Sequence, residues 1–106
     1  MQTETHIASA WSEAVAGGDV AALLELYHPH VVVETPMGRW HGVDEVADGL
    51  GALRWRKLRQ HSIIACHVQS DRIALITQHG DWLVEHVLQV VGGQVRAHRM
   101  RLAPVC

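Results

Sequence analysis

The stretch RIALITQHGDWLVEHVLQVV, residues 72–91, decides the fold class. It holds two runs rich in Val, Ile and Leu on either side of Gly80-Asp81, and Gly-Asp is a favourable two-residue turn between antiparallel strands. With this turn Leu75 faces His86, and opposed residues share one face of a sheet. The stretch therefore predicts a β-hairpin whose more apolar face carries a histidine in its middle.

The same pattern continues on both sides of this hairpin. A run over residues 58–69 precedes it through the turn Ser70-Asp71, and a run over residues 95–102 follows it through Gly92-Gly93. Four strands in a row predict an antiparallel meander. If Ser70-Asp71 is a two-residue turn, the earlier strand turns one set of residues toward the apolar face, namely Ile64, Cys66 and Val68. The other face then carries Ile63, Ala65 and His67, which with Ala74, Ile76 and Val87 make an apolar patch that suits a second copy of the chain.

The last turn leaves two registers open. A two-residue turn pairs His86 with Arg99 and directs Arg99 and Arg101 inward. A three-residue loop with a bulge pairs His86 with Met100 and directs His98 and Met100 inward. We favour the second register, because it avoids burying two unpaired arginines at a cost of roughly several kcal/mol each.

The first half of the chain carries helical patterns. The pair Gly17-Gly18 ends a first helix, whose apolar stripe is Ile7, Ala10, Trp11, Ala14 and Val15. Asp19 is a good N-cap for a second helix, whose stripe is Val20, Leu23, Leu24 and Tyr27. Pro29 ends this helix, because the residue before a proline is biased out of the α region.

A strand and a third helix complete this half. The run VVVET, residues 31–35, predicts a strand with Thr35 pointing inward and Glu34 outward. Trp40 follows on a short returning strand, and the third helix has the stripe Val43, Val46, Ala47, Leu50 and Leu53. Helices followed by a meander predict an α+β fold, with three helices packed on one face of a curved antiparallel sheet.

Length and composition limit the function classes. A chain of 106 residues supports a single domain, 1–106, and 48% hydrophobic residues suffice for a core. The net charge of −2 gives no reason to expect nucleic acid, and no apolar run approaches the ~20 residues of a membrane span. We see no signal peptide, so we expect a cytoplasmic protein with reduced Cys66 and Cys106. The basic run RWRKLR, residues 54–59, suits a solvated helix end.

Two stretches together resemble a known superfamily. AGGDVAALLELYHPHVVVETPMGRWHGVDEVADGL, residues 16–50, and GGQVRAHRM, residues 92–100, resemble the nuclear transport factor 2-like superfamily, in particular its SnoaL-like and ketosteroid isomerase branch. The resemblance implies a cone-shaped, cystatin-like α+β barrel around a hydrophobic pocket. It also implies homodimers that pair through the outer sheet face, and small apolar ligands.

The resemblance also shows where the usual chemistry is replaced. The position of the family's aspartate base is Thr35, and the positions of its two oxyanion donors are Trp11 and His86. The acid of the hydrolase and cyclase branches corresponds to Met100. Proton transfer inside the pocket therefore falls to histidine, the side chain that titrates nearest neutrality.

The expected site follows from these residues. We expect His86 and His98 as catalytic residues, with the ligand-binding residues Trp11, Tyr27, Thr35, Leu50, Trp82 and Met100. A metal site from His79, His86 and His98 has no supporting ligand-spacing motif, so we expect neither a metal nor a cofactor. The predicted function is an isomerase or lyase acting on a small apolar molecule with a polar end, such as a polyketide, terpenoid or steroid-like compound. The alternative is a non-catalytic homodimeric binding protein.

Overall fold

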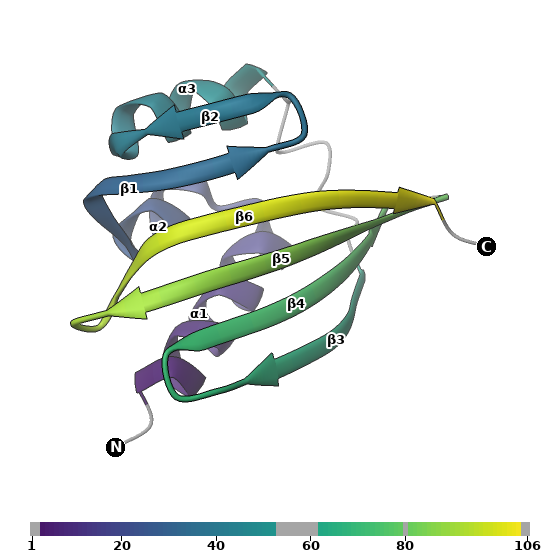
Figure 1. The fold of residues 1–106 in the computed structure, drawn as a ribbon, viewed down its shortest axis with the longest axis horizontal. Helices are drawn as coiled ribbons and strands as arrows, with labels where there is room; N and C mark the ends of the chain where they lie inside the picture. Colours follow the sequence, from purple (N-terminus) through teal and green to yellow (C-terminus); the bar gives the residue numbers. More distant parts are fainter. Residues whose placement is uncertain (1–2, 53–61, 80, 105–106) are drawn as a thin grey trace.

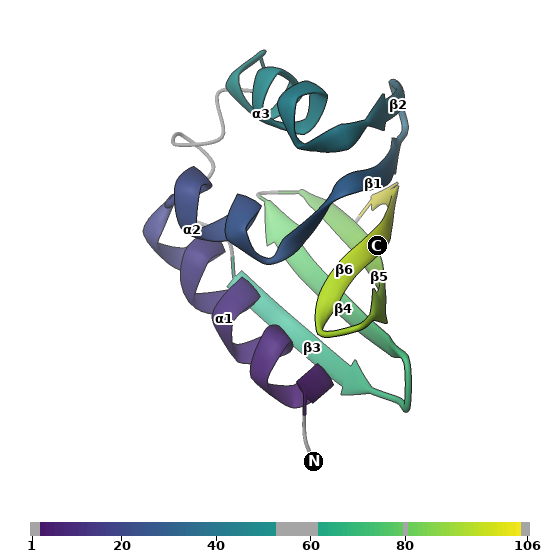
Figure 2. The ribbon, with the colours of Figure 1, turned by 90° about the vertical axis from the view of Figure 1, so that its left-hand side faces the viewer.

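A curved, open six-stranded sheet with three helices on its concave side makes up the fold (Figures 1 and 2). The structure is a computed structural model that describes residues 3–52, 62–79 and 81–104. The helices and strands run in the order α1 (Thr3–Gly17), α2 (Val20–Glu25), β1 (Tyr27–Thr35), β2 (Gly38–His41), α3 (Gly42–Ala52), β3 (Ser62–Val68), β4 (Arg72–His79), β5 (Trp82–Val91) and β6 (Gln94–Pro104). This arrangement confirms the predicted α+β class.

The strands lie in the order β2-β1-β6-β5-β4-β3, so the first strand lies beside the last. Every neighbouring pair is antiparallel except β1 and β6, which run in the same direction (Figure 1). Val33 of β1 is the partner of His98 of β6 in this parallel pair. The sequence predicts an entirely antiparallel sheet, and the structure differs at this one junction.

The second helix is shorter than its apolar stripe predicts. It ends at Glu25, and Tyr27 is already the first residue of β1. The backbone carbonyl of Leu26 accepts a hydrogen bond of 2.8 Å from the backbone N–H of Val95, so pairing with β6 draws the chain out of the helix. Pro29 lies inside β1 where the register with β6 shifts, a position at which the missing N–H is tolerated. The prediction of a helix through Tyr27 is therefore wrong.

The hairpin between β3 and β4 has the predicted turn but contains a bulge. The backbone N–H of Gln69 donates to the carbonyl of Arg72 at 2.8 Å, as a two-residue Ser70-Asp71 turn requires. Further along, Ile63 lies opposite Thr77 while Ile64 is passed over in the pairing. Ile63 therefore packs against the core and Ile64 is 51% exposed, the reverse of the predicted faces.

The last hairpin combines features of both predicted registers. Its turn has two residues, Gly92 and Gly93, and both have positive φ values, 61° and 80°, as the tight turn between antiparallel strands requires. A bulge at Arg96 then shifts the register, so that His86 lies opposite Met100. The extra residue thus lies inside β6 and not in the loop, and the favoured register is confirmed.

The core lies between the helices and the concave face of the sheet. α1 contacts β3 and β4, while α3 contacts β1 and β2. The basic run 54–59 and the start of the predicted strand at residue 58 lie outside the described residues. Among the helices that the structure describes, none combines the length and the apolar character needed to cross a membrane. A cytoplasmic location stays a prediction.

Candidate functional site

Five buried side chains on the concave side form a continuous chain of hydrogen bonds. The Trp11 Nε1–H donates to the Tyr27 hydroxyl at 3.1 Å, and this hydroxyl lies 2.8 Å from Nδ1 of His98. His98 Nε2 lies 3.0 Å from His86 Nδ1, and His86 Nε2 lies 3.1 Å from the Thr77 hydroxyl. Each of the five is at most 4% exposed. We call these five side chains the buried polar chain.

Five different elements contribute to the buried polar chain. Trp11 comes from the apolar stripe of α1 and Tyr27 from the first residue of β1, while Thr77, His86 and His98 come from β4, β5 and β6. The bulge in β6 turns His98 to the same face as His86, and makes the two histidines diagonal neighbours on adjacent strands. Four of the candidate residues named from the sequence therefore meet, although His98 and Tyr27 are 71 residues apart.

The order of the side chains indicates which group donates in each hydrogen bond. An indole nitrogen can only donate, so the Tyr27 oxygen accepts from Trp11, and we assign the single Tyr27 hydrogen to His98 Nδ1. His98 then donates through Nε2 to His86 Nδ1, and His86 donates through Nε2 to Thr77. Both histidines are neutral in this arrangement. Thr77 and His86 also take part in interactions with residues outside the buried polar chain.

Burial favours the uncharged forms of His98 and Tyr27. Loss of hydration lowers the pKa of His98 to about 3, because the imidazolium form is disfavoured away from water. Burial also raises the pKa of the Tyr27 hydroxyl well above its ordinary value, and the hydrogen bond from Trp11 opposes this only in part. At neutral pH His98 is consequently a weak base and a good neutral hydrogen-bonding partner.

Aromatic packing fixes the orientation of the rings in the buried polar chain. The Trp11 ring lies edge-on to the rings of His86 and His98, with centroids 5.0 and 6.1 Å apart. The Tyr27 and His98 rings meet in a similar way at 5.9 Å. Edge-to-face contacts of this kind add to the energy of burial, so the rings form a tightly packed group.

Thr35 does not join the buried polar chain. It lies on the same face of β1 as the buried Val33, as alternation predicts, but its hydroxyl donates to the Gly38 carbonyl at 2.9 Å and accepts from the Met37 N–H at 3.1 Å. Both contacts hold the tight turn between β1 and β2. A hydroxyl engaged in this way has little capacity left for a ligand, so the structure gives Thr35 a local structural role.

The other candidate residues lie at different depths. Leu50 of α3 is buried in the core, and Met100 is partly buried directly opposite His86. Trp82 is 50% exposed at the start of β5, and Leu102 of β6, which the sequence reasoning did not select, is 52% exposed. His86 lies four positions beyond Trp82 along β5, a distance of about 13 Å. An apolar strip therefore runs from the exposed end of the concave face to the buried histidines.

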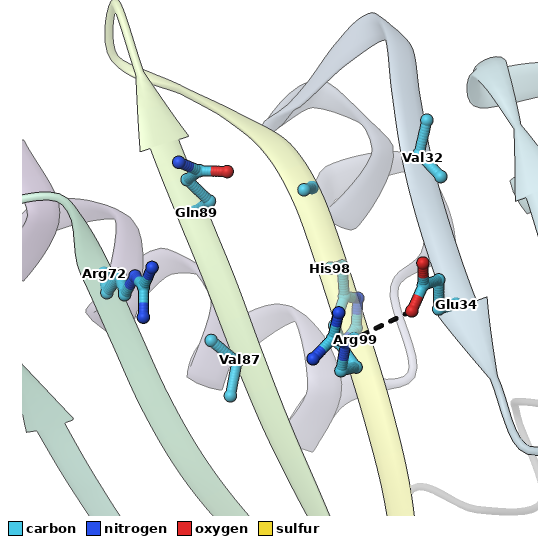
Figure 3. A pocket seen from close by; sticks show the side chains of 8 residues that line it. Val32, Glu34, Arg72, Val87, Gln89, His98 and Arg99 are labelled. Atoms are coloured by element: carbon cyan, nitrogen blue, oxygen red, sulfur yellow. Dashed lines mark hydrogen bonds and ion pairs between the residues drawn. The ribbon is translucent and has the colours of Figure 1, made fainter.

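A separate pocket lies on the outer, convex face of the sheet. It has a volume of about 280 Å³ and is lined by residues of β1, β4, β5 and β6, namely Val32, Glu34, Arg72, Val87, Gln89, Ala97, His98 and Arg99 (Figure 3). Glu34 faces outward there, as predicted, and pairs with Arg39 at 2.9 Å and Arg99 at 3.1 Å. The sequence reasoning missed this pocket, although alternation along the strands places all of its lining residues except His98 on one face.

Comparisons with known structures agree on the fold. A protein with a cystatin-like fold from Silicibacter pomeroyi superimposes with a TM-score of 0.83 at 21% identity, covering 97% of this chain and 77% of that one. A putative polyketide cyclase from Sinorhizobium meliloti gives 0.77 at 17% identity, covering 95% and 100%. TerC, co-crystallised with polyporic acid, gives 0.80 at 13% identity, covering 96% and 92%.

Sequence comparison defines the family. Among curated proteins, none matches the sequence of this chain. The model of the SnoaL-like domain matches residues 8–101, which include every member of the buried polar chain and all six strands except the end of β6. This chain belongs to the SnoaL-like domain family.

Proposed function

We propose that the protein binds a small apolar molecule with one neutral polar end, on the concave side of the sheet. The observation that carries this proposal is the buried polar chain, in which two buried histidines lie at the inner end of an apolar strip. Exposure along this strip falls from half at Trp82 to 3% at His86, so a molecule entering at Trp82 leaves water before its leading end meets a histidine.

The chemistry of the site favours a neutral polar group on the ligand. The five side chains of the buried polar chain include no carboxylate and no permanent cation, and the low pKa of His98 keeps its imidazole uncharged at neutral pH. Placing a charged group there without a partner is costly, whereas a carbonyl or hydroxyl needs only one or two hydrogen bonds. Ketones, lactones and alcohols therefore suit this site better than acids or amines.

Two relatives of the same fold support this proposal by their descriptions alone. One is described as a putative polyketide cyclase and the other was co-crystallised with polyporic acid. Both share under 25% of their residues with this chain, so their ligands are a guide to the class of compound to test and no more.

The second candidate function is catalysis, as an isomerase or lyase that moves a proton. The observation that favours it is the continuity of the buried polar chain, in which Tyr27, His98 and His86 each hold one proton and accept another. A concerted shift along the buried polar chain avoids a charged imidazole, which the low pKa of His98 disfavours. As His86 gives its Nε2 proton to the substrate, it would take the proton of His98, and His98 would take that of Tyr27, which leaves a Tyr27 phenolate that the Trp11 N–H stabilises. The proton that the substrate then releases would return along the same path and restore Tyr27.

A thermal-shift screen tests the binding proposal. Wild type, His86→Ala and Leu88→Ala are screened against small apolar alcohols, ketones, lactones and epoxides. Leu88 is a buried neighbour of His86 on the same face, so its truncation destabilises the fold by about 2–5 kcal/mol without removing the polar anchor. A shift that is lost in His86→Ala and kept in Leu88→Ala supports the proposal. Equal shifts in all three proteins, or none in wild type, contradict it.

Deuterium exchange then separates binding from catalysis. Each stabilising compound is incubated with the protein in D₂O, and incorporation at carbon is followed by NMR. Catalysis predicts incorporation by wild type and its loss in Tyr27→Phe, which interrupts the chain of protons behind His98. Binding without incorporation in wild type removes the catalytic function and leaves the binding function in place.

We also propose that two copies of the chain pair through the outer sheet face. Ala65, Ala74, Ile76 and Val87 lie on that face, and Ile64 at the bulge adds exposed apolar surface. Sedimentation equilibrium of wild type and Ile76→Glu tests this. A dimer that dissociates in the variant supports the pairing, and a monomeric wild type contradicts it.

A further inference from the structure

The pocket on the outer face has the size of a site for a very small molecule. We call it the outer pocket, with the eight lining residues given above. Its volume of about 280 Å³ lies just below the lower end of typical ligand pockets, about 300 Å³. Seven of its lining residues turn their side chains to the outer face, whereas the side chain of His98, the eighth, belongs to the buried polar chain on the concave side of the same sheet.

The charges that line the outer pocket do not balance. Arg72 and Arg99 stand on either side of Val87 and face a single carboxylate, Glu34, which gives the lining a formal charge of +1 in a chain of net charge −2 (Figure 3). Glu34 already uses one oxygen for Arg39 and the other for Arg99. Among the described residues Arg72 takes part in no ion pair. The outer pocket therefore carries a cation that lacks an anion.

The floor between these charges is apolar. Val32, Val87 and Ala97 line the pocket from β1, β5 and β6, and the amide of Gln89 lies beside them on β5. Arg99 reaches Glu34 through Nε, so its two terminal nitrogens take no part in that hydrogen bond. A guanidinium fork binds a carboxylate with two parallel hydrogen bonds, and an apolar floor suits a short hydrocarbon body.

We propose that the outer pocket binds a small monocarboxylate with an apolar body. The carboxylate lies between Arg72 and Arg99, and the hydrocarbon lies on Val32, Val87 and Ala97. One negative charge neutralises the lining, whereas a doubly charged phosphate would add repulsion with Glu34. This ligand differs in charge from the one proposed for the concave side, so the two sites select different compounds.

Titration with hexanoate, followed by NMR of the backbone amides, tests this inference. Hexanamide is the uncharged control of the same shape. We expect saturable shifts in β4, β5 and β6 with a dissociation constant of about 1 mM, which is ordinary for so few atoms. Arg72→Gln removes one charged partner and weakens binding about tenfold. The matched control is Arg101→Gln, an exposed arginine of the same face of β6 outside the lining, which changes binding less than about twofold.

Other results overturn the inference. Equal binding of hexanamide, equal weakening in both arginine variants, or no saturation at concentrations about tenfold above the expected constant each exclude a specific carboxylate site. Shifts confined to His86 and its neighbours would place hexanoate on the concave side instead. Sedimentation velocity on the same samples covers a last outcome: if hexanoate does not bind and Arg72→Gln alters the oligomeric state, the lining of the outer pocket belongs to the interface between copies proposed above.

Discussion

Acid will destabilise this protein through His98, and the size of the effect follows from its burial. The folded state holds the pKa of His98 at about 3, below the ordinary value of 6.5 that applies to the unfolded chain. Below pH 6.5 the unfolded chain therefore binds a proton that folded His98 does not bind. The free energy of unfolding then falls with pH by about 1.4 kcal/mol per unit, until the folded pKa is reached. Lowering the pH from 6.5 to 5 removes about 2 kcal/mol.

Urea unfolding followed by tryptophan fluorescence measures this loss. Wild type, His98→Asn and His67→Asn are unfolded at several pH values between about 7 and 5. His67 is an exposed histidine of β3, so its replacement controls for the removal of one histidine. We expect wild type and His67→Asn to lose about 2 kcal/mol more than His98→Asn over this range. For a domain of this size that is a midpoint shift of about 1–2 M urea.

Two results would refute this reasoning. One is an equal loss of stability in wild type and His98→Asn, measured after near-UV circular dichroism has shown that the variant is folded at pH 7. The other needs no variant. We expect the NMR signal of the His98 ring to keep its neutral chemical shift in folded wild type throughout this range, and a change of that shift would refute the reasoning. A ring that titrates near its ordinary pKa would mean that water reaches the buried polar chain.

Three further substitutions test the packing and the ion pairs. Tyr27→Phe leaves the buried Trp11 N–H and His98 Nδ1 without their shared partner, and we expect a loss of about 2–5 kcal/mol in urea unfolding. Gly49→Ala drives a methyl group into the indole of Trp40 and should cost about 1–3 kcal/mol, which the double variant with Trp40→Leu recovers in thermal unfolding. Glu34→Gln removes two exposed ion pairs, so we expect thermal unfolding to show a loss of less than about 1 kcal/mol in the free energy of unfolding.

The parts of the fold that depend on nearby residues could be predicted from the sequence. The hairpin between β4 and β5 pairs as a two-residue Gly80-Asp81 turn requires, and Gly92-Gly93 sets the turn of the next hairpin, although the bulge at Arg96 then shifts its register. The early end of α2 could not be foreseen, because it is caused by a hydrogen bond from Val95, far along the chain. The bulge at Ile64 has no local signal either, since a bulge inserts one ordinary residue between two ordinary neighbours.

The candidate site also contains residues that local patterns predict and residues that only the folded sheet brings together. Alternation along β5 predicted the inward position of His86, and the cost of burying arginines together with the family resemblance predicted that of His98. Thr35 was predicted to bind the ligand because alternation gives its face. The sequence does not show that its hydroxyl makes two hydrogen bonds in the neighbouring turn. The outer pocket was missed because Arg72 and Arg99, taken singly, look like ordinary solvated residues, and only the sheet brings them together.

The pairing of β1 with β6 has a consequence for how the protein folds. During synthesis β1 emerges early, yet its partner on one side is the strand that emerges last. Such long-range pairing is slow to form, because a long loop must close before the contact contributes any energy. Until then β1 has an unpaired edge, which favours association with other chains. The contact between Tyr27 and His98 spans a similar separation, so the buried polar chain can close only after β6 has been synthesised.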